Sequence, residues 1–209
     1  MKTIALRDVA DPMSLVGEVS RVLKGGGLVC IPCSGRYRIV ADLENEAAVM
    51  RLMQAKARVK TAPALVFVDG VDQLARVADH VPERVRQLAD AYWPGPLTIR
   101  VSPNDNLPRK VLKQLGGNKV RLGVRVPLDD LMLAVTSEVG SPLLVSSANR
   151  QKKAGESSPA QVRKTFANRV DLFIDAGDLQ PGPKSTVVDV SGERLMVERE
   201  GAISLAAAE

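Results

Sequence analysis

Apolar residues recur every three or four positions in five stretches of the chain, which is the period of a helix with one buried face. In the first stretch Asp11 and Pro12 form a cap and first-turn pair, and Leu15, Val19 and Leu23 follow on one side before three glycines. The pattern predicts helices over residues 12–24, 44–57, 82–91, 131–139 and 159–167.

Short, continuous apolar runs separate these helices and are typical of buried strands. The first run is broken by Pro32, after which we expect an irregular loop. The predicted strands cover residues 28–31, 64–68, 97–101, 120–126, 143–145, 172–174, 187–190 and 195–198. Helices and strands alternate with no repeat or long linker, so we expect a single α/β domain over residues 1–209 with a mixed sheet.

The bulk composition agrees with one ordinary domain. At 209 residues and 45% hydrophobic, the chain can bury a sizeable core without disulfides or a structural metal. Aromatic residues make up only 3%, which disfavours single-stranded nucleic acid bound on stacking platforms. The net charge of +5 favours anionic partners, and a merely soluble basic surface is the alternative.

The first residues lack the apolar segment of a signal peptide, and no stretch approaches the length of a membrane span. We therefore expect a cytoplasmic protein with no membrane contact. The two cysteines, Cys30 and Cys33, cannot complete a four-ligand zinc site. Their spacing matches a redox motif, but Cys30 lies inside a predicted strand, so we expect reduced thiols and keep a redox protein as a minor alternative.

Two polar segments are candidates for binding an anion. Ser147 and Asn149 lie directly after a predicted strand, where hydroxyl and amide groups can bind phosphate or carbonyl oxygens or can serve as turn residues. Lys56, Arg58 and Lys60 lie where the chain leaves the C-terminus of a predicted helix, and they can bind phosphate or compensate the helix dipole there.

Arg125 lies within an otherwise apolar predicted strand. A guanidinium there is costly unless it meets an anion or lies at the edge of a cavity, and a structural ion pair is the alternative. Ser185 precedes a late strand and Arg199 ends one, so either can line a site or close the sheet. The chain has no P-loop, and His80 is its single histidine.

Six short motifs in order resemble the YrdC-like family of threonylcarbamoyl-adenylate synthases. The family pattern has a Pro-Thr loop, Lys-x-Arg, Pro-Gly-Pro-Leu-Thr, Arg-x-Pro, Ser-x-Ala-Asn and Ser-Thr-x-x-Asp. The corresponding segments here are residues 32–33, 56–58, 94–98, 125–127, 147–149 and 185–189. The resemblance covers nearly the whole chain.

The resemblance implies an open, twisted mixed sheet with surrounding helices and a concave basic cavity. It implies an L-threonylcarbamoyladenylate synthase, a nucleotidyltransferase that joins threonine, bicarbonate and ATP, releases pyrophosphate and serves the modification of adenosine 37 in tRNA. It also implies ATP with Mg²⁺ as the substrate complex and no structural metal. The implied partners are a nucleotide, double-stranded RNA or tRNA, and other tRNA-modification proteins.

The resemblance also implies roles for individual residues, while no catalytic residue is assigned. Lys56, Arg58, Ser147, Asn149, Ser157 and Arg199 would bind the nucleotide and its phosphates. Cys33, Phe67, Arg125 and Ser185 would occupy threonine-facing positions. We expect Arg125, Ser147 and Asn149 to reach one shared cavity.

The chain departs from the family pattern where threonine would bind. The family loop Pro-Thr-Asp/Glu-Thr-Val-Tyr-Gly-Leu becomes residues 32–39 here, without either threonine or the acid and with Arg36 and Arg38 added. Phe67 stands where the family commonly has a histidine. The sequence therefore leaves two hypotheses open: a synthase, or a non-catalytic paralogue that binds RNA or a nucleotide.

Overall fold

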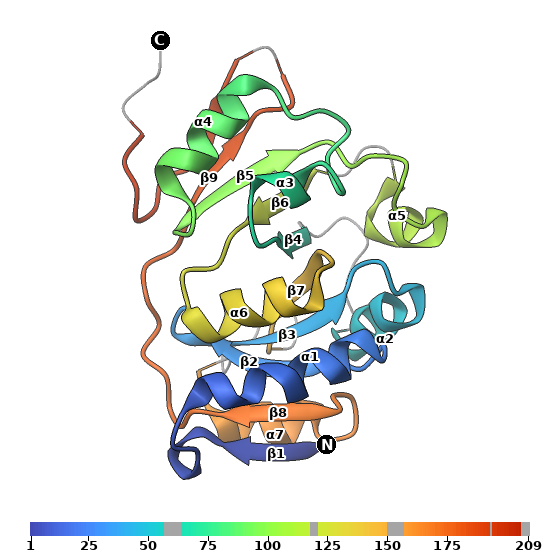
Figure 1. Cartoon of the computed structure of the whole chain (residues 1–209), viewed down its shortest axis with the longest axis vertical. Helices are drawn as coiled ribbons and strands as arrows, with labels where there is room; N and C mark the ends of the chain where they lie inside the picture. Colours follow the sequence, from blue (N-terminus) through green and yellow to red (C-terminus); the bar gives the residue numbers. More distant parts are fainter. Residues whose placement is uncertain (57–63, 118–120, 150–156, 193, 206–209) are drawn as a thin grey trace.

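The computed structural model describes residues 1–209 except 57–63, 118–120, 150–156, 193 and 206–209. Ten strands form one twisted sheet in the order β1-β8-β2-β3-β7-β4-β6-β5-β9-β10 (Figure 1). Four neighbouring pairs are parallel and five are antiparallel, which confirms the mixed sheet. The strands are β1 (Lys2–Ala5), β2 (Val29–Cys33), β3 (Arg36–Asp42), β4 (Ala64–Phe67), β5 (Leu97–Val101), β6 (Leu122–Arg125), β7 (Leu143–Ser147), β8 (Leu172–Asp175), β9 (Thr186–Asp189) and β10 (Met196–Arg199).

The five helices predicted from the apolar period are all present. Asp11 caps a short 3-10 turn (Pro12–Leu15) by accepting a hydrogen bond from the Met13 backbone N–H, and this turn leads into the first α-helix. The α-helices are α1 (Val16–Lys24), α2 (Glu46–Lys56), α3 (Val71–Leu74), α4 (Glu83–Tyr92), α5 (Arg109–Leu115), α6 (Asp130–Val139) and α7 (Pro159–Phe166), and a second 3-10 turn covers Leu6–Asp8.

The two faces of the sheet have separate hydrophobic cores. Residues of α2, α4, α5 and α7 pack on one face, which we call the first face. Residues of α1 and α6 pack on the other, the second face, against β2, β3, β7 and β8. Figure 1 shows α1 and α6 side by side across the lower half of the sheet. Among the described residues, the second-face core includes none from β5, β6 or β9. The second face of these three strands is therefore not part of that core.

The segment after Pro32 differs from the expected irregular loop. Strand β2 continues through Pro32 to Cys33, and Ser34 and Gly35 alone connect it to β3, with φ values of 53° and 70°. Two consecutive positive φ values are typical of a tight hairpin turn. Pro32 is tolerated because β2 pairs with β8 only at Val29 and Cys30, so Pro32 lies beyond that pairing.

Four elements were not predicted from the sequence: β1, β3, α3 and α5. Strand β3 is the most important of them, because it lies in the middle of the sheet between β2 and β7. Its residues Arg36 and Arg38 alternate with the buried Tyr37 and Ile39, which places the arginines on one face and the apolar residues on the other.

A long connection links β8 to β9 and joins the two halves of the sheet along the left edge of Figure 1. The Tyr37 hydroxyl anchors its beginning by donating a hydrogen bond to the Gly177 carbonyl (2.7 Å) and accepting one from the Ala176 N–H (2.9 Å). Among the described residues, no helix has the length and apolar character needed to cross a bilayer.

Candidate functional site

A cavity lined by cationic and hydroxyl side chains lies on the second face, beside the region covered by α1 and α6. It has a volume of about 420 Å³. All charged side chains among the described residues that line it are cationic: Arg36, Arg38, Arg100, Arg125, Lys184 and Arg199. The other described lining residues are Ser34, Ala64, Leu65, Thr98, Gly123, Ser147, Pro183, Ser185 and Val187. We call this cavity the basic pocket.

Strand register explains why the pocket is polar where the neighbouring surface is core. Along β3, Val40 packs under the helices on the second face, and Arg38 and Arg36 follow at every second residue. Along β7, Val145 is followed in the same way by Ser147, which pairs with Arg38. The face therefore changes from apolar to polar where helix cover ends.

Two rows of paired residues form the rest of the pocket floor. In one, Leu65 pairs with Gly123, which pairs with Arg100. Gly123 is needed because a Cβ there would lie 2.9 Å from the Thr98 side chain. In the other row, Arg125 lines the pocket and pairs with Phe67, whose side chain packs in the second-face core.

Arg125 is the most deeply buried arginine of the pocket, with 7% of its surface exposed. Its Nη2 donates a hydrogen bond to Ser34 Oγ (3.3 Å), and its Nε has no hydrogen-bond partner among the described residues. Burial lowers the pKa of the Arg125 guanidinium, and the nearby Cys33 and Asp129 oppose that change. The described ion pairs include none with Arg125, so the structural ion pair considered from the sequence is not what places it there.

Ser185 and Arg199 form the opposite wall of the pocket. Arg199 donates to the Ser185 carbonyl from Nη2 (2.8 Å) and Nε (3.1 Å), and the Ser185 hydroxyl lies 3.1 Å from Thr98 Oγ1. Arg100 pairs with Glu198 (3.0 Å), the residue before Arg199. These contacts connect β5, β9 and β10 around one side of the cavity.

Lys56, Ser147 and Asn149 form a polar cluster next to the pocket. Lys56 is only 8% exposed and donates to the carbonyls of Ser147 and Asn149 and to Asn149 Oδ1 (3.1 Å). Ser147 Oγ also donates to Asn149 Oδ1 (2.8 Å). Of the three residues expected to share a cavity, Arg125 and Ser147 line the basic pocket, while Asn149 is not among its described lining residues.

Ser157 and Arg58 are the two other residues that the sequence suggested for nucleotide binding. The Ser157 carbonyl accepts a hydrogen bond from the Leu179 N–H (2.8 Å), which connects the start of α7 to the β8–β9 connection. Arg58 lies outside the described residues. The contacts of Lys56 favour an indirect role, in which it holds the segment after β7 in place.

Cys33 and Phe67, expected at threonine-facing positions, have buried side chains in the second-face core at 2% and 1% exposure. Neither is among the described lining residues of the pocket. Burial, together with the Asp129 carboxylate that accepts its hydrogen bond, raises the pKa of Cys33 from 9.0 to about 12.

The two cysteines belong to different cores, since Cys30 packs on the first face and Cys33 on the second. Both are free thiols. Residues three apart on a strand point to opposite faces, so their sulfur atoms cannot approach for a disulfide. This geometry gives the redox alternative no support.

Three pocket residues were given no role in a site from the sequence: Ser34, Thr98 and Arg100. Arg36 and Arg38 were noted as departures, and an alternating pattern over residues 36–40 was the available signal for their shared face. Asp129, which contacts Ser34, gave no local signal, because it meets the turn through tertiary contacts 95 residues apart in sequence.

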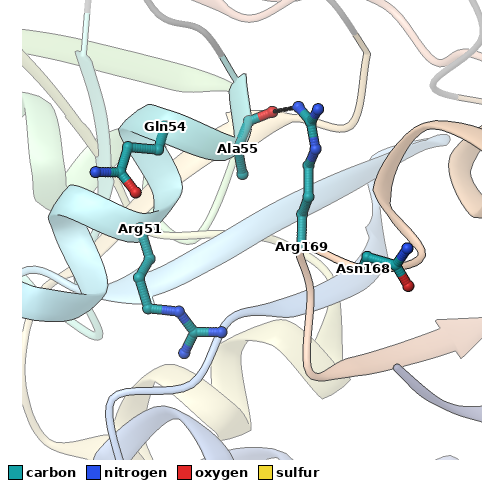
Figure 2. Close-up of a pocket in the computed structure, with 5 residues that line it drawn as sticks. All are labelled: Arg51, Gln54, Ala55, Asn168 and Arg169. Carbon is teal, nitrogen blue, oxygen red and sulfur yellow. Dashed lines mark hydrogen bonds between the residues drawn. The ribbon is translucent and has the colours of Figure 1, made fainter.

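A second pocket of about 240 Å³ lies between α2 and the segment after α7 (Figure 2). It contains Arg51 and Arg169, but both serve structural contacts. Arg169 donates to the Ala55 carbonyl near the end of α2, and Arg51 pairs with Asp171 (2.9 Å). Because its arginines are engaged in this way, this pocket is a weaker candidate than the basic pocket.

No group of three or more potential metal ligands occurs among the described residues. The described lining of the basic pocket has no carboxylate or histidine, which are the side chains that hold resident divalent ions. The residues present therefore do not fit a protein-bound Mg²⁺ ion, whereas Mg²⁺ carried on the phosphates of ATP would belong to the substrate.

The open, twisted mixed sheet and its basic pocket define an α/β protein suited to binding an anionic ligand. The family model Sua5_yciO_yrdC, described as "Telomere recombination", matches residues 21–201, and the chain belongs to this family.

Named relatives agree with this assignment. The chain is 29% identical to the threonylcarbamoyl-AMP synthase of Pyrococcus abyssi over 183 residues, which cover 88% of this chain and 53% of the relative. It is 30% identical to the threonylcarbamoyl-AMP synthase of Halorhodospira halophila over 159 residues, covering 76% of this chain and 81% of the relative. The chain thus spans about half the length of the P. abyssi protein and most of the other.

Solved structures show the same fold. The crystal structure of P. abyssi Sua5 complexed with L-threonine matches with a TM-score of 0.81 and 26% identity, covering 96% of this chain and 57% of that chain. The crystal structure of Escherichia coli YciO matches with a TM-score of 0.78 and 22% identity, covering 96% and 95%. These matches confirm the expected fold class.

Proposed function

We propose that this protein is a threonylcarbamoyl-AMP synthase that joins threonine, bicarbonate and ATP in the basic pocket and releases pyrophosphate. The observation that supports this most is the convergence of Arg125, Ser147, Ser185 and Arg199, from four different strands or their ends, on one cationic pocket. Relatives named for this activity, and a similar structure complexed with L-threonine, support the choice of reaction.

The described pocket residues suit catalysis by positioning and charge. In the proposed reaction the threonine nitrogen bonds to the carbon of bicarbonate with loss of water, and a carbamate oxygen then bonds to the α-phosphorus as pyrophosphate leaves. Cationic groups already in place can stabilise the negative charge that develops on the departing phosphates. The described lining residues include no carboxylate or histidine, so none of them is assigned as a general base.

Roles follow the position of each group. We assign Arg125 and Ser185 to threonine, with Arg125 binding its carboxylate, and Arg199 and Ser147 to the nucleotide. Asn149, which is hydrogen-bonded to Ser147 of the pocket, and Ser157 are proposed nucleotide contacts. Lys56 and Arg58 are proposed to act on the phosphates, Lys56 by holding the carbonyls of Ser147 and Asn149 in place.

We propose that the product and the basic surface both serve tRNA. The product would serve modification of adenosine 37 in tRNA, in the cytoplasm and with other tRNA-modification proteins. Duplex RNA or tRNA would bind the cationic surface around the pocket through its phosphates, with an affinity that falls as salt rises.

A second candidate is a paralogue that binds a nucleotide or RNA without making the adenylate. The observation that favours it is the wall formed by β3, where Arg36 and Arg38 line the pocket, together with the burial of Cys33 and Phe67. Cys33 and Phe67 stand where the resemblance leads us to expect a threonine and a histidine, and neither is among the described lining residues of the pocket.

Incubation with ATP, Mg²⁺, bicarbonate and threonine separates the two candidates. The synthase releases pyrophosphate only when threonine is present and forms threonylcarbamoyl-AMP, which mass spectrometry detects. Saturable ATP binding without either product would support the second candidate, the paralogue that binds a nucleotide without making the adenylate. The Arg125→Lys variant is measured in parallel. It keeps the positive charge but loses the planar guanidinium, so we expect a higher KM for threonine.

A further inference from the structure

Asp129 lies just before α6, at the position where an aspartate commonly caps a helix. Its side chain makes no capping hydrogen bond to that helix. The carboxylate instead points across to the hairpin turn between β2 and β3, which it reaches with both oxygens. An N-cap carboxylate normally stabilises its own helix, so this arrangement favours a different task.

Cys33 and Ser34, at the hairpin turn, donate three hydrogen bonds to this one carboxylate. The Ser34 N–H donates to Oδ1 (2.8 Å), the Ser34 hydroxyl donates to Oδ2 (3.0 Å), and the Cys33 thiol donates to Oδ2 (3.2 Å). Ser34 has a φ of 53°, which is unfavourable for a residue with a Cβ. The three bonds offset that cost and fix the direction of the Ser34 hydroxyl.

The Ser34 hydroxyl connects this anchor to the basic pocket. Because its proton is donated to Asp129, the oxygen offers its lone pairs to Arg125, whose Nη2 lies 3.3 Å away. Both Ser34 and Arg125 line the pocket, whereas Asp129 is not among its described lining residues. The chain of contacts runs from Asp129 through Ser34 to Arg125.

We propose that Asp129 is a positioning residue, which holds Ser34 so that the Arg125 guanidinium faces the anionic ligand of the pocket. The proposal rests on the proposed function only in taking the basic pocket as the place where an anionic ligand binds. A guanidinium binds phosphate oxygens as well as carboxylate oxygens, so pyrophosphate reports on Arg125 even where its own ligand is the carboxylate of threonine. It applies equally to a synthase and to a nucleotide-binding paralogue.

Electrostatics and positioning predict opposite effects when Asp129 is removed. A carboxylate near an anion site repels the anion, so its loss by itself would tighten binding. Loss of the anchor would release Ser34 and Arg125 and would weaken binding. Asp130 is a matched control, because it is the next residue, carries the same charge, is exposed, and belongs to the first turn of the same helix.

The test measures the affinity of the full chain for inorganic pyrophosphate by calorimetry. We expect Asp129→Ala to weaken binding about tenfold and Asp130→Ala to change it less than about twofold. In an Arg125→Ala background we expect Asp129→Ala to weaken pyrophosphate binding by less than about a further twofold, because the two residues act in one chain of contacts. Tighter binding by Asp129→Ala, or full additivity with Arg125→Ala, would overturn the proposal, as would a wild-type protein that does not bind pyrophosphate.

Ser34→Ala provides a second route if Asp129→Ala does not fold. It removes the bridging hydroxyl and keeps the backbone hydrogen bond to Asp129, and we expect the same loss of affinity. The test does not use threonine or adenylate formation. A protein that makes no threonylcarbamoyl-AMP but shows the expected cycle would contradict the proposed function and support this inference.

Discussion

Single residues show how local chemistry depends on the surrounding fold. Lys56 and Arg125 are cations that the sequence marked as candidates for anion binding, and both are almost fully buried. Their partners differ: Lys56 binds backbone carbonyls next to the pocket, while Arg125 binds one hydroxyl inside it. The residue type was therefore informative, but the task of each residue depends on its partners.

The buried thiol of Cys33 predicts a dependence of stability on pH. Its pKa is raised from 9.0 to about 12, so above pH 9 the unfolded chain loses this proton while the folded protein keeps it. The stability contribution is thus complete below pH 9 and is lost as the pH rises towards 12. Urea unfolding between pH 8 and pH 10.5 should show that the free energy of unfolding falls with pH, and that it falls less steeply in Cys33→Ala. An equally steep fall in the variant would contradict the raised pKa of Cys33.

The tight hairpin turn predicts that Gly35 cannot be replaced. Its φ is 70°, and a Cβ would lie 2.1 Å from the Gln180 carbonyl oxygen of the β8–β9 connection. Gly177 is a matched control, with a φ of 76° and no atom within 4 Å of the added Cβ. We expect Gly35→Ala to lower the free energy of unfolding by about 1 to 3 kcal/mol more than Gly177→Ala. Equal losses in denaturant unfolding would show that backbone conformation alone matters.

At the scale of elements, Lys56 attaches the end of α2 to the segment after β7. Lys56→Met would leave the carbonyls of Ser147 and Asn149 without this donor, so we expect a loss of about 3 kcal/mol in the free energy of unfolding. Lys110→Met is the control, because its pair with Glu46 is exposed to solvent, and we expect no measurable change. Urea unfolding of both variants checks this prediction, and similar effects would contradict it.

Strand register, rather than any single element, assembles the pocket. Arg38 pairs with Ser147, and Gly123 lies between Leu65 and Arg100 across three strands. These pairs connect segments far apart in sequence, and a shift of one residue would turn each side chain to the other face. The hairpin of β2 and β3 is therefore as important to the pocket as the strands whose motifs were recognised.

At the scale of the whole molecule, a ligand in the basic pocket would contact both halves of the sheet, since the described lining includes residues of β3 and β7 as well as of β5, β6 and β10. A ligand that binds the folded protein and not the unfolded chain stabilises the fold. ATP with Mg²⁺ at about 100 times its Kd should then add about 2.7 kcal/mol to the free energy of unfolding. The increase should shrink as salt is added, because the pocket attracts the ligand by charge. Thermal unfolding with and without ATP measures it.

Arg51→Gln is the control for that measurement. Arg51 belongs to the second pocket and pairs with Asp171, so the variant itself should be less stable. The additional stability due to ATP should nevertheless equal that of the wild-type protein. A smaller ATP effect in this variant than in the wild type would indicate that the second pocket binds the nucleotide.

The sequence by itself determined the fold class, the helices with a clear apolar period and eight of the strands, at least in part, because burial of one face imposes a periodicity that can be read locally. It also pointed to Arg125, since a guanidinium in an apolar strand needs a polar partner. Strand β3 was missed because its arginines mask the apolar alternation, and they face a pocket that exists only in the folded sheet.

Only the tertiary structure decided which candidates share a site. Cys33 and Phe67 lie on the second face but pack in its core, whereas Arg36, Arg38 and Ser147 continue that face beyond the cover of α1 and α6. Asp129 reaches Ser34 across 95 positions in the sequence. Such contacts depend on strand order and helix placement, which arise from the packing of the whole chain and leave no local pattern in the residues themselves.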